Sequence, residues 1–351
     1  MAEGATERPG YSVPRVALRG VVTALPARRV TNGHFQSTFS DSDINDVVKM
    51  IGVEARHWAA DGQTTADLCQ AAASRLLERL GWDALSVDAL IFVSQTPNQR
   101  LPATACELHG ALGLGPDCQA LDVGLGCSGY VYGLWLASAL ISAGCRRVLL
   151  LAGDTSSRMI DPRDRGTALL FGDAGTASAL EASPAAEPIH FVLGTDGSGA
   201  RNLIVQGGGF RGVVADERRP EGYDPDHLFM DGGAVFSFTL KAVPALIRDT
   251  LARAGAQPDQ LDALVLHQAN RFMLNHIAKK AGVGAERTPI NIDRYGNTSS
   301  ASIPLVLTTD LASRLTAEPM RLLMAGFGVG YSWGGAYMAT TPLGCAETLT
   351  L

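Results

Sequence analysis

Two short segments of this chain recur in the same order and at the same spacing, and this repeat limits the folds that the chain can adopt. Val87–Val93 (VDALIFV) matches Leu261–His267 (LDALVLH), and Arg147–Gly153 matches Arg321–Gly326 with one residue dropped. All four segments are apolar enough to be buried strands, and their shared order favours an internal duplication. Because strands alternate with helical stretches in both copies, the sequence predicts two similar α/β halves with mainly parallel or mixed sheets covered by helices.

A long helical stretch precedes each Asp-Ala-Leu strand, at 64–80 in the first copy and at 238–254 in the second. In the first stretch Thr64 fits an N-cap, apolar residues recur every four positions, and Gly81 follows the last turn. Residues 1–12 are expected to form an irregular lead. Further strands are expected at 15–25, 119–123, 146–152 and 177–181, and a further helix at 103–112.

A glycine-rich turn lies between the matched strands of the first copy. The apolar run Gln119–Val123 leads into this turn, and Tyr130–Ile141, which is apolar almost all round, follows it as an expected buried helix. Cys127 stands just before that helix, where free N–H groups and the helix dipole favour an anion. We therefore expect the Cys127 thiol to ionise below its usual pKa and to act as a nucleophile.

The same turn allows two other interpretations. Gly124-x-Gly126-x-x-Gly129 matches the dinucleotide-binding fingerprint, and Asp154 ends the next strand, where such folds carry an acidic residue. A free cysteine is also often no more than part of a core. The dinucleotide interpretation leaves the thiol in the turn unexplained, so we rank it below the nucleophile.

Two further polar residues follow apolar strands or turns in the second copy. His267 ends its strand, and Asn297 occupies the place in the second copy that Cys127 has in the first. Alone, His267 is equally well a buried structural histidine, and Asn297 a turn residue. Ligands gather at the carboxyl ends of strands in α/β sheets, so pseudo-symmetry would bring all three side chains together.

Composition excludes several classes of function. The chain has 351 residues, 46% hydrophobic and 18% charged, with a net charge of −6, which argues against wholesale nucleic-acid binding. No apolar run reaches the length of a membrane span, and the first residues lack the apolar core of a signal peptide. The six cysteines show neither CxxC pairing nor metal-ligand spacing. We therefore expect a cytoplasmic protein with reduced thiols, no membrane or nucleic-acid partner, and no metal or other cofactor.

Six motifs in this order resemble the β-ketoacyl-acyl carrier protein synthase III group of the thiolase-like condensing enzymes, from about Val16 to Thr340. They are the segments 122–129 (DVGLGCSG), 161–167 (DPRDRGT), 171–173 (FGD), 267–270 (HQAN), 295–299 (YGNTS) and 326–334 (GFGVGYSWG). The resemblance implies a thiolase-like α/β fold, with two pseudo-symmetric βαβαβαβ halves in a five-layer αβαβα sandwich. The halves would be residues 1–182 and 183–351, and the protein would be a homodimer.

The resemblance also implies a reaction, a decarboxylative Claisen condensation. Cys127 would take the acyl group from an acyl-CoA or an acyl-acyl carrier protein, forming an acyl-enzyme. The backbone N–H groups of Cys127 and Val329 would form the oxyanion hole. His267 and Asn297 would donate hydrogen bonds to the thioester oxygen of malonyl-acyl carrier protein or malonyl-CoA and stabilise the enolate formed when CO2 leaves.

Further contacts come from the resemblance alone. It implies a nucleotide-contacting Arg158 and an acyl-pocket gate across the dimer at Leu101, with substrate also bound by Phe236 and Asn270. Docking of the carrier protein is assigned to Lys279, Lys280 and Arg271. The stretch 44–51 lacks the Trp and Arg that hold the coenzyme A adenine in many members, and Ser237 and Phe272 replace basic residues. These departures suggest a secondary-metabolism or surface-glycan paralog with an unusual acyl group.

Two rival functions use the same fold. An acyltransferase would pass the acyl group from Cys127 to an alcohol or amine with His267 as base, without decarboxylation. A paralog without catalytic activity would only bind acyl groups. Asn297 favours condensation, because simple transfer needs no group to stabilise an enolate.

Overall fold

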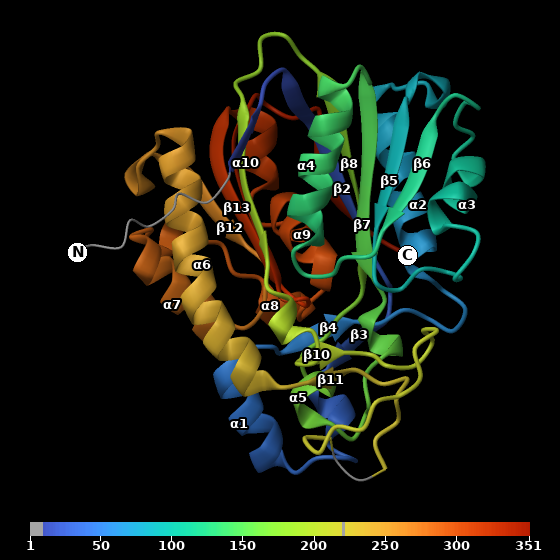
Figure 1. Ribbon diagram of the computed structural model, residues 1–351, viewed down its shortest axis with the longest axis vertical. Helices are drawn as coiled ribbons and strands as arrows, with labels where there is room; N and C mark the ends of the chain where they lie inside the picture. The colour runs from blue at the N-terminus through green and yellow to red at the C-terminus, as the bar shows by residue number, and fades with distance from the viewer. Residues whose placement is uncertain (1–9, 220–221) are drawn as a thin grey trace.

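The computed structural model describes residues 10–219 and 222–351 and shows two stacked mixed sheets, each covered by helices (Figure 1). The first sheet runs, in spatial order, β15 (Cys345–Thr350), β2 (Val16–Leu25), β8 (Ala174–Ala182), β7 (Arg147–Asp154), β5 (Ala89–Val93) and β6 (Gln119–Val123). The second runs β1 (Gly10–Val13), β9 (Ile189–Thr195), β14 (Ser332–Thr340), β13 (Met320–Gly328) and β12 (Ala263–Leu266).

The helices complete five layers, as expected for a thiolase-like fold. Buried side chains of both sheets and of two central helices form one continuous core, and two further cores lie beneath the outer helices. In Figure 1 the outer and central layers follow each other across the molecule. The outer helices are α2 (Thr65–Leu80) and α3 (Thr104–Ala111) on the first sheet and α6 (Gly232–Ala254) and α7 (Arg271–Ala281) on the second, and the central ones are α4 (Gly129–Ser142) and α9 (Ser302–Thr308).

The expected duplication is present in the pairing of the strands. β5 pairs with β7 in parallel and β7 with β8 antiparallel, and β12, β13 and β14 repeat this order. The aspartates of the two Asp-Ala-Leu strands play matching parts: Asp88 accepts from the backbone N–H of Arg147 at 2.9 Å, and Asp262 from that of Arg321 at 2.8 Å. The second copy has no strand equivalent to β6 within the described residues.

The first strand of the described chain belongs to the second sheet, and the last strand belongs to the first sheet. β1 pairs with β9 of the second sheet, whereas β15 pairs with β2 of the first. The boundary expected after residue 182 falls between β8 and β9. The irregular lead expected over 1–12 is wrong from Gly10 onward, because β1 begins there, and the rest of it lies outside the described residues.

Smaller elements gather at one end of the two sheets (Figure 1). Two two-stranded sheets lie there, β3 (Arg29–Thr31) with β4 (Ala55–His57), and β10 (Leu203–Ile204) with β11 (Phe229–Met230). The α-helices not yet named, at this end or elsewhere in the described chain, are α1 (Asp41–Ile51), α5 (Arg165–Ala168), α8 (Ile292–Tyr295) and α10 (Ala312–Ala317).

Local signals placed α2 correctly. The Thr64 side chain accepts from the backbone N–H of Asp67, the Asp67 side chain accepts from the N–H of Thr64, and Gly81 ends the helix with a φ of 63°. The buried face of α2 packs on β8, where Gly175 permits close contact. An ideal Cβ on Gly175 would lie 2.5 Å from Cβ of Leu68 and 2.6 Å from the backbone nitrogen of the next residue.

The substitution Gly175→Ala should therefore destabilise the protein by about 1–3 kcal/mol, because backbone atoms of α2 would have to move. Urea unfolding measures the change. Gly110→Ala is the matched control, because it adds the same methyl group in α3 where no atom lies within 4 Å. A Gly175→Ala protein as stable as the control would contradict the packing described.

Candidate active site

Cys127 lies in the loop that joins β6 to α4, at the carboxyl end of a strand of the first sheet. The glycines around it allow close packing. An ideal Cβ on Gly129 would lie 2.5 Å from Cγ1 of Val93, and one on Gly126 would lie 2.3 Å from Oε1 of Gln95. None of the three fingerprint glycines has a positive φ angle, so they bring the helix and side chains near the loop without a left-handed turn.

Burial has the largest effect on the pKa of the Cys127 thiol. Burial and the negative charge of Asp154 raise the pKa of this thiol to about 11, and hydrogen bonds from Ser299 and from the backbone N–H groups of Val329 and Cys127 oppose the rise. The expectation of a lowered pKa is therefore wrong. The loop after β13 covers the thiol so closely that an ideal Cβ on Gly328 would lie 3.0 Å from Sγ.

His267 follows β12 and is almost completely buried. Burial lowers the pKa of this histidine to about 3, so the imidazole is neutral at pH 7. Nδ1 lies 2.7 Å from Oγ of Ser302, whose hydroxyl donates to the carbonyl of Ser299 at 2.9 Å. Because the serine has a single hydrogen, Nδ1 carries the imidazole proton and Nε2 is left as an acceptor.

Asn297 lies in the loop between α8 and the short 3-10 helix Ser299–Ala301. Asn297 was expected at the carboxyl end of a strand, but it does not end a strand of either large sheet. Its backbone forms only an isolated bridge with Phe171. The backbone N–H of Ser299 donates to Oδ1 of Asn297 at 2.9 Å. This bond fixes the amide, and within the described residues no hydrogen bond occupies the Nδ2 group, which remains a donor.

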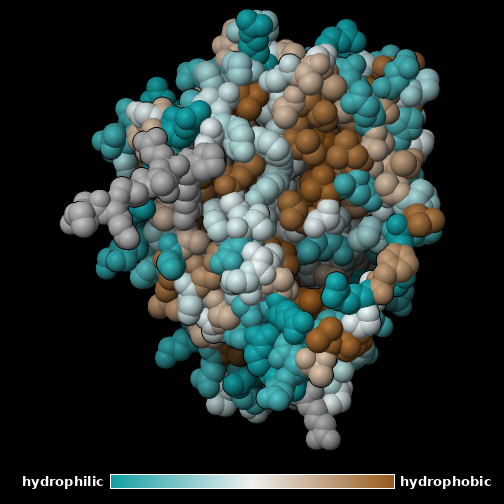
Figure 2. Space-filling model, in the orientation of Figure 1, coloured by the Kyte–Doolittle hydropathy of each residue, from teal (hydrophilic) through white to brown (hydrophobic). Residues whose placement is uncertain are grey.

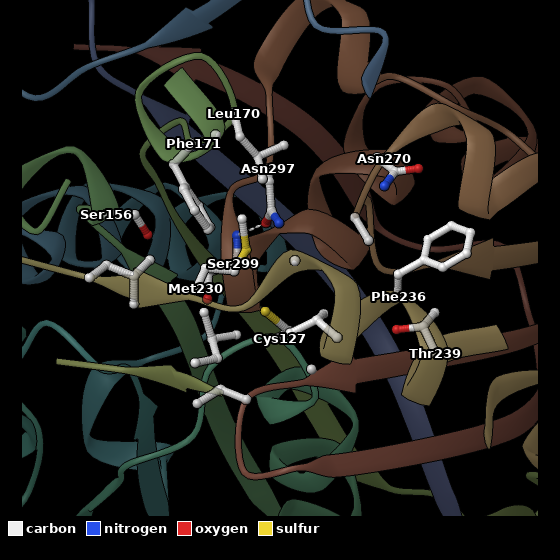
Figure 3. Close-up of a pocket in the computed structure, with 18 of the residues that line it drawn as sticks. Cys127, Ser156, Leu170, Phe171, Met230, Phe236, Thr239, Asn270, Asn297 and Ser299 are labelled. Carbon is white, nitrogen blue, oxygen red and sulfur yellow. Dashed lines mark hydrogen bonds between the residues drawn. The ribbon is translucent and has the colours of Figure 1, made fainter. Parts of the chain in front are cut away.

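The three side chains line one cavity of about 1040 Å³. Figure 3 shows Cys127 at its centre below Asn297, with Ser156, Leu170 and Phe171 to one side and Phe236, Thr239 and Asn270 to the other. His267 and Val329 also line the cavity. The fold therefore brings a thiol, a neutral imidazole and an amide donor from three distant segments to one space.

Of the other residues expected to bind substrate, two line the cavity and two do not. Phe236 and Asn270 line the cavity. Arg158 does not, because its guanidinium donates to two backbone carbonyl groups at 2.6 and 3.2 Å. Arg165 lines the cavity instead, a residue that the sequence analysis did not single out. Leu101 is 77% exposed and lies outside the cavity.

The expected docking residues lie on α7. Lys279 and Lys280 are exposed in its last turn, and Arg271 begins the helix, where its guanidinium donates to the carbonyl of Gly52 at 3.2 Å. Asn270 caps the same helix by accepting from the backbone N–H of Met273 at 2.7 Å. α7 thus connects the cavity wall to a basic patch on the surface.

Asp154 has a role that the sequence analysis missed. Its Oδ1 accepts from the backbone N–H of Gln95 at 2.7 Å, and its Oδ2 accepts from the hydroxyl of Ser300 at 2.8 Å. The carboxylate therefore links a loop of the first half to the Asn297 loop of the second. It is buried, and both oxygens are occupied, so it is not available to a nucleotide ribose. An aspartate ending a strand was the only signal for it in the sequence.

Three other features bear on the expected chemistry. No group of three or more His, Cys, Asp or Glu side chains in the described part of the chain could hold a metal ion. All six cysteines are free. Over 10–219 and 222–351, no helix is long and apolar enough to cross a membrane.

Comparisons with known proteins show the family to which the chain belongs. Models of 3-oxoacyl-[acyl-carrier-protein] synthase III and of its C-terminal part match residues 121–197 and 251–340. The chain is 34% identical to β-ketoacyl-[acyl-carrier-protein] synthase III of Neisseria meningitidis serogroup B, over 92% of this chain and 98% of that protein.

Solved structures give the same answer. A 3-oxoacyl-(acyl-carrier protein) synthase from Burkholderia xenovorans LB400 is 53% identical, with a TM-score of 0.96 over 98% of this chain and 99% of that one. The priming β-ketosynthase of the R1128 polyketide pathway is 27% identical, with a TM-score of 0.82 over 97% and 100%. With its thiolase-like fold and its cysteine, histidine and asparagine around one cavity, the chain belongs to the β-ketoacyl-[acyl-carrier-protein] synthase III family.

Proposed function

We propose that this protein condenses an acyl thioester with a malonyl thioester through an acyl-Cys127 intermediate, releasing CO2. One observation carries the proposal: Cys127, His267 and Asn297 line a single cavity, although they come from different halves of the chain. Its relatives are named β-ketoacyl-[acyl-carrier-protein] synthase III or 3-oxoacyl-(acyl-carrier protein) synthase, which supports the same reaction class.

In the first step the thiol of Cys127 attacks the carbonyl of the acyl thioester. At pH 7 the thiol and His267 are both neutral, so the proton moves to Nε2 of His267 as the carbon–sulfur bond forms. The backbone N–H groups of Cys127 and Val329 lie beside the sulfur and stabilise the oxyanion. The leaving thiolate then takes the proton and departs as a free thiol.

In the second step the malonyl thioester loses its carboxylate as CO2, and the bonding electrons pass into an enolate. Nδ2 of Asn297 donates to the enolate oxygen, because Ser299 holds Oδ1 and leaves the N–H groups free. His267 donates there only when Nε2 carries a proton. The enolate carbon attacks acyl-Cys127, and the sulfur leaves as a thiolate that takes up a proton.

We infer that the acyl donor and the malonyl donor are carried by coenzyme A or by an acyl carrier protein, with docking on α7. Lys279 and Lys280 are exposed at the end of this helix, whereas Asn270 and Met273 near its start line the cavity. A carrier protein bound to the lysines would lie beside the cavity. The six free cysteines support a reducing, cytoplasmic location.

We also propose a homodimer formed through β6. β6 is the edge strand of the first sheet and leaves one side of its backbone unpaired. Trp135, Leu136 and Leu140 of α4 are only partly buried, and Figure 2 shows an apolar area over this part of the molecule. Sedimentation should give twice the monomer mass for the wild type and the monomer mass for Leu136→Glu; a wild-type monomer would refute the dimer.

Substitution should separate the two steps. Cys127→Ala should give no acyl adduct by intact mass with any acyl thioester, because the nucleophile is gone. Asn297→Ala should still form the adduct but should release CO2 from malonyl thioester about 10²–10³-fold more slowly, as expected for loss of one oxyanion donor. Asn297→Ala with normal CO2 release would contradict the role of the amide. Loss of the acyl group from Cys127 to an alcohol or amine without CO2 would favour simple transfer.

Acylation of Cys127 should be nearly independent of pH between 5 and 8. The lowered pKa of His267, about 3, keeps the base neutral over this whole range, and the raised pKa of Cys127, about 11, keeps the thiol protonated. A histidine with its ordinary pKa would be only about 3% neutral at pH 5. Single-turnover adduct formation followed by mass measures the rate, and a drop of tenfold or more from pH 8 to pH 5 would contradict the assignment.

A further inference from the structure

We propose that the acyl group carried by Cys127 bears a neutral hydrogen-bonding substituent, such as a hydroxyl or oxo group, that Gln95 and Ser156 recognise. This inference rests on the proposed acyl-Cys127 intermediate. It extends that proposal to the class of acyl group, and it gives a function to two side chains of the cavity that the condensation chemistry does not use.

Gln95 and Ser156 follow neighbouring strands. β5 and β7 pair in parallel, with Val93 opposite Ala152, so continuing this register places Gln95 beside Asp154, two residues before Ser156. Asp154 fixes this arrangement by accepting from the backbone N–H of Gln95 at 2.7 Å. Both Gln95 and Ser156 line the cavity that contains Cys127.

The amide of Gln95 lies next to the nucleophile. An ideal Cβ on Gly126, the residue before Cys127, would be 2.3 Å from Oε1 of Gln95 and 3.0 Å from its Cδ. A substituent that reaches this amide must therefore stand within the first few carbons of the acyl chain.

Both polar groups are open to a ligand, although Gln95 is an exposed residue and only Ser156 is buried. Across the described residues, no hydrogen bond is made by the side-chain amide of Gln95 or by the hydroxyl of Ser156. Ser156 is only 2% exposed. An acyl chain that covers this hydroxyl without bonding to it costs about 1–3 kcal/mol, so a chain that bonds to it gains affinity over one that does not.

Several apolar side chains line the cavity on the side of Ser156. In Figure 3 Ser156 lies on the same side of Cys127 as Leu170 and Phe171, and away from Phe236 and Thr239. Further apolar lining residues are Met159, Leu203, Leu228 and Met230. A plain alkyl chain would fill these walls but would displace water from the two polar groups without replacing its hydrogen bonds.

The charges of the cavity exclude an ionised substituent. Its charged lining residues are Asp154, Asp164 and Arg165. Arg165 is paired with Asp43 at 2.6 Å, and Asp154 is occupied by Gln95 and Ser300. No described residue of the lining therefore offers an unpaired positive charge to a carboxylate on the acyl chain, and the buried Asp154 would repel such a carboxylate.

Competition between two thioesters tests the proposal. The protein is mixed with equal concentrations of the N-acetylcysteamine thioesters of hexanoic and 3-hydroxyhexanoic acid, and the two adducts on Cys127 are counted by intact mass in a single turnover. The wild type should favour the hydroxylated chain about tenfold. The double variant Gln95→Met, Ser156→Ala should lose this preference and give a ratio near one.

Thr239→Val is the matched control, because Thr239 also lines the cavity with a buried side chain but lies on the other side of Cys127. It should change both rates by the same factor and keep the ratio. Equal or greater use of the hexanoyl thioester by the wild type would overturn the inference while leaving the acyl-enzyme intact. A preference that survives in the double variant would overturn the assignment to these residues. Absence of both adducts would overturn the proposed function and the inference with it.

Discussion

The arrangement of the cavity depends on the buried carboxylate of Asp154. One oxygen holds the Gln95 loop of the first half, and the other holds Ser300 beside the Asn297 loop of the second half. Because these loops lie far apart in the sequence, a charged acceptor satisfied by backbone and hydroxyl donors is what keeps them in register. The duplicated topology brings the strand ends together, and this carboxylate fixes the side chains that follow them.

Burial makes the central pair of the site neutral. It raises the pKa of Cys127 and lowers that of His267, so a charge appears only as the thiol attacks. Backbone N–H groups that do not titrate are then well suited to stabilise the oxyanion, and we propose that the fixed amide of Asn297 does the same for the enolate. Ser156 lines the same cavity, and the proposed contact between its hydroxyl and the acyl chain would connect the chemistry of the site to the choice of acyl group.

The features that local patterns could predict are those with short-range causes: the capped helix α2, the turn that carries Cys127, and His267 at the end of a buried strand. The rest depends on contacts between distant segments. The thiol pKa was misjudged because the loop after β13 covers Cys127, which a helix N-terminus alone does not reveal. The resemblance points to Arg158, and only the fold shows that Arg165 lines the cavity. The hydrogen bond from Nδ1 of His267 to Oγ of Ser302, which sets the tautomer of His267, spans 35 residues.

In the proposed reaction, one acyl group on Cys127 is consumed for each malonyl group decarboxylated. Purified acyl-enzyme is mixed with malonyl thioester labelled in its free carboxylate, and labelled CO2 is measured against the loss of adduct. The expected ratio is one, with a β-ketoacyl thioester as product. Loss of the acyl group without CO2 would refute the condensation.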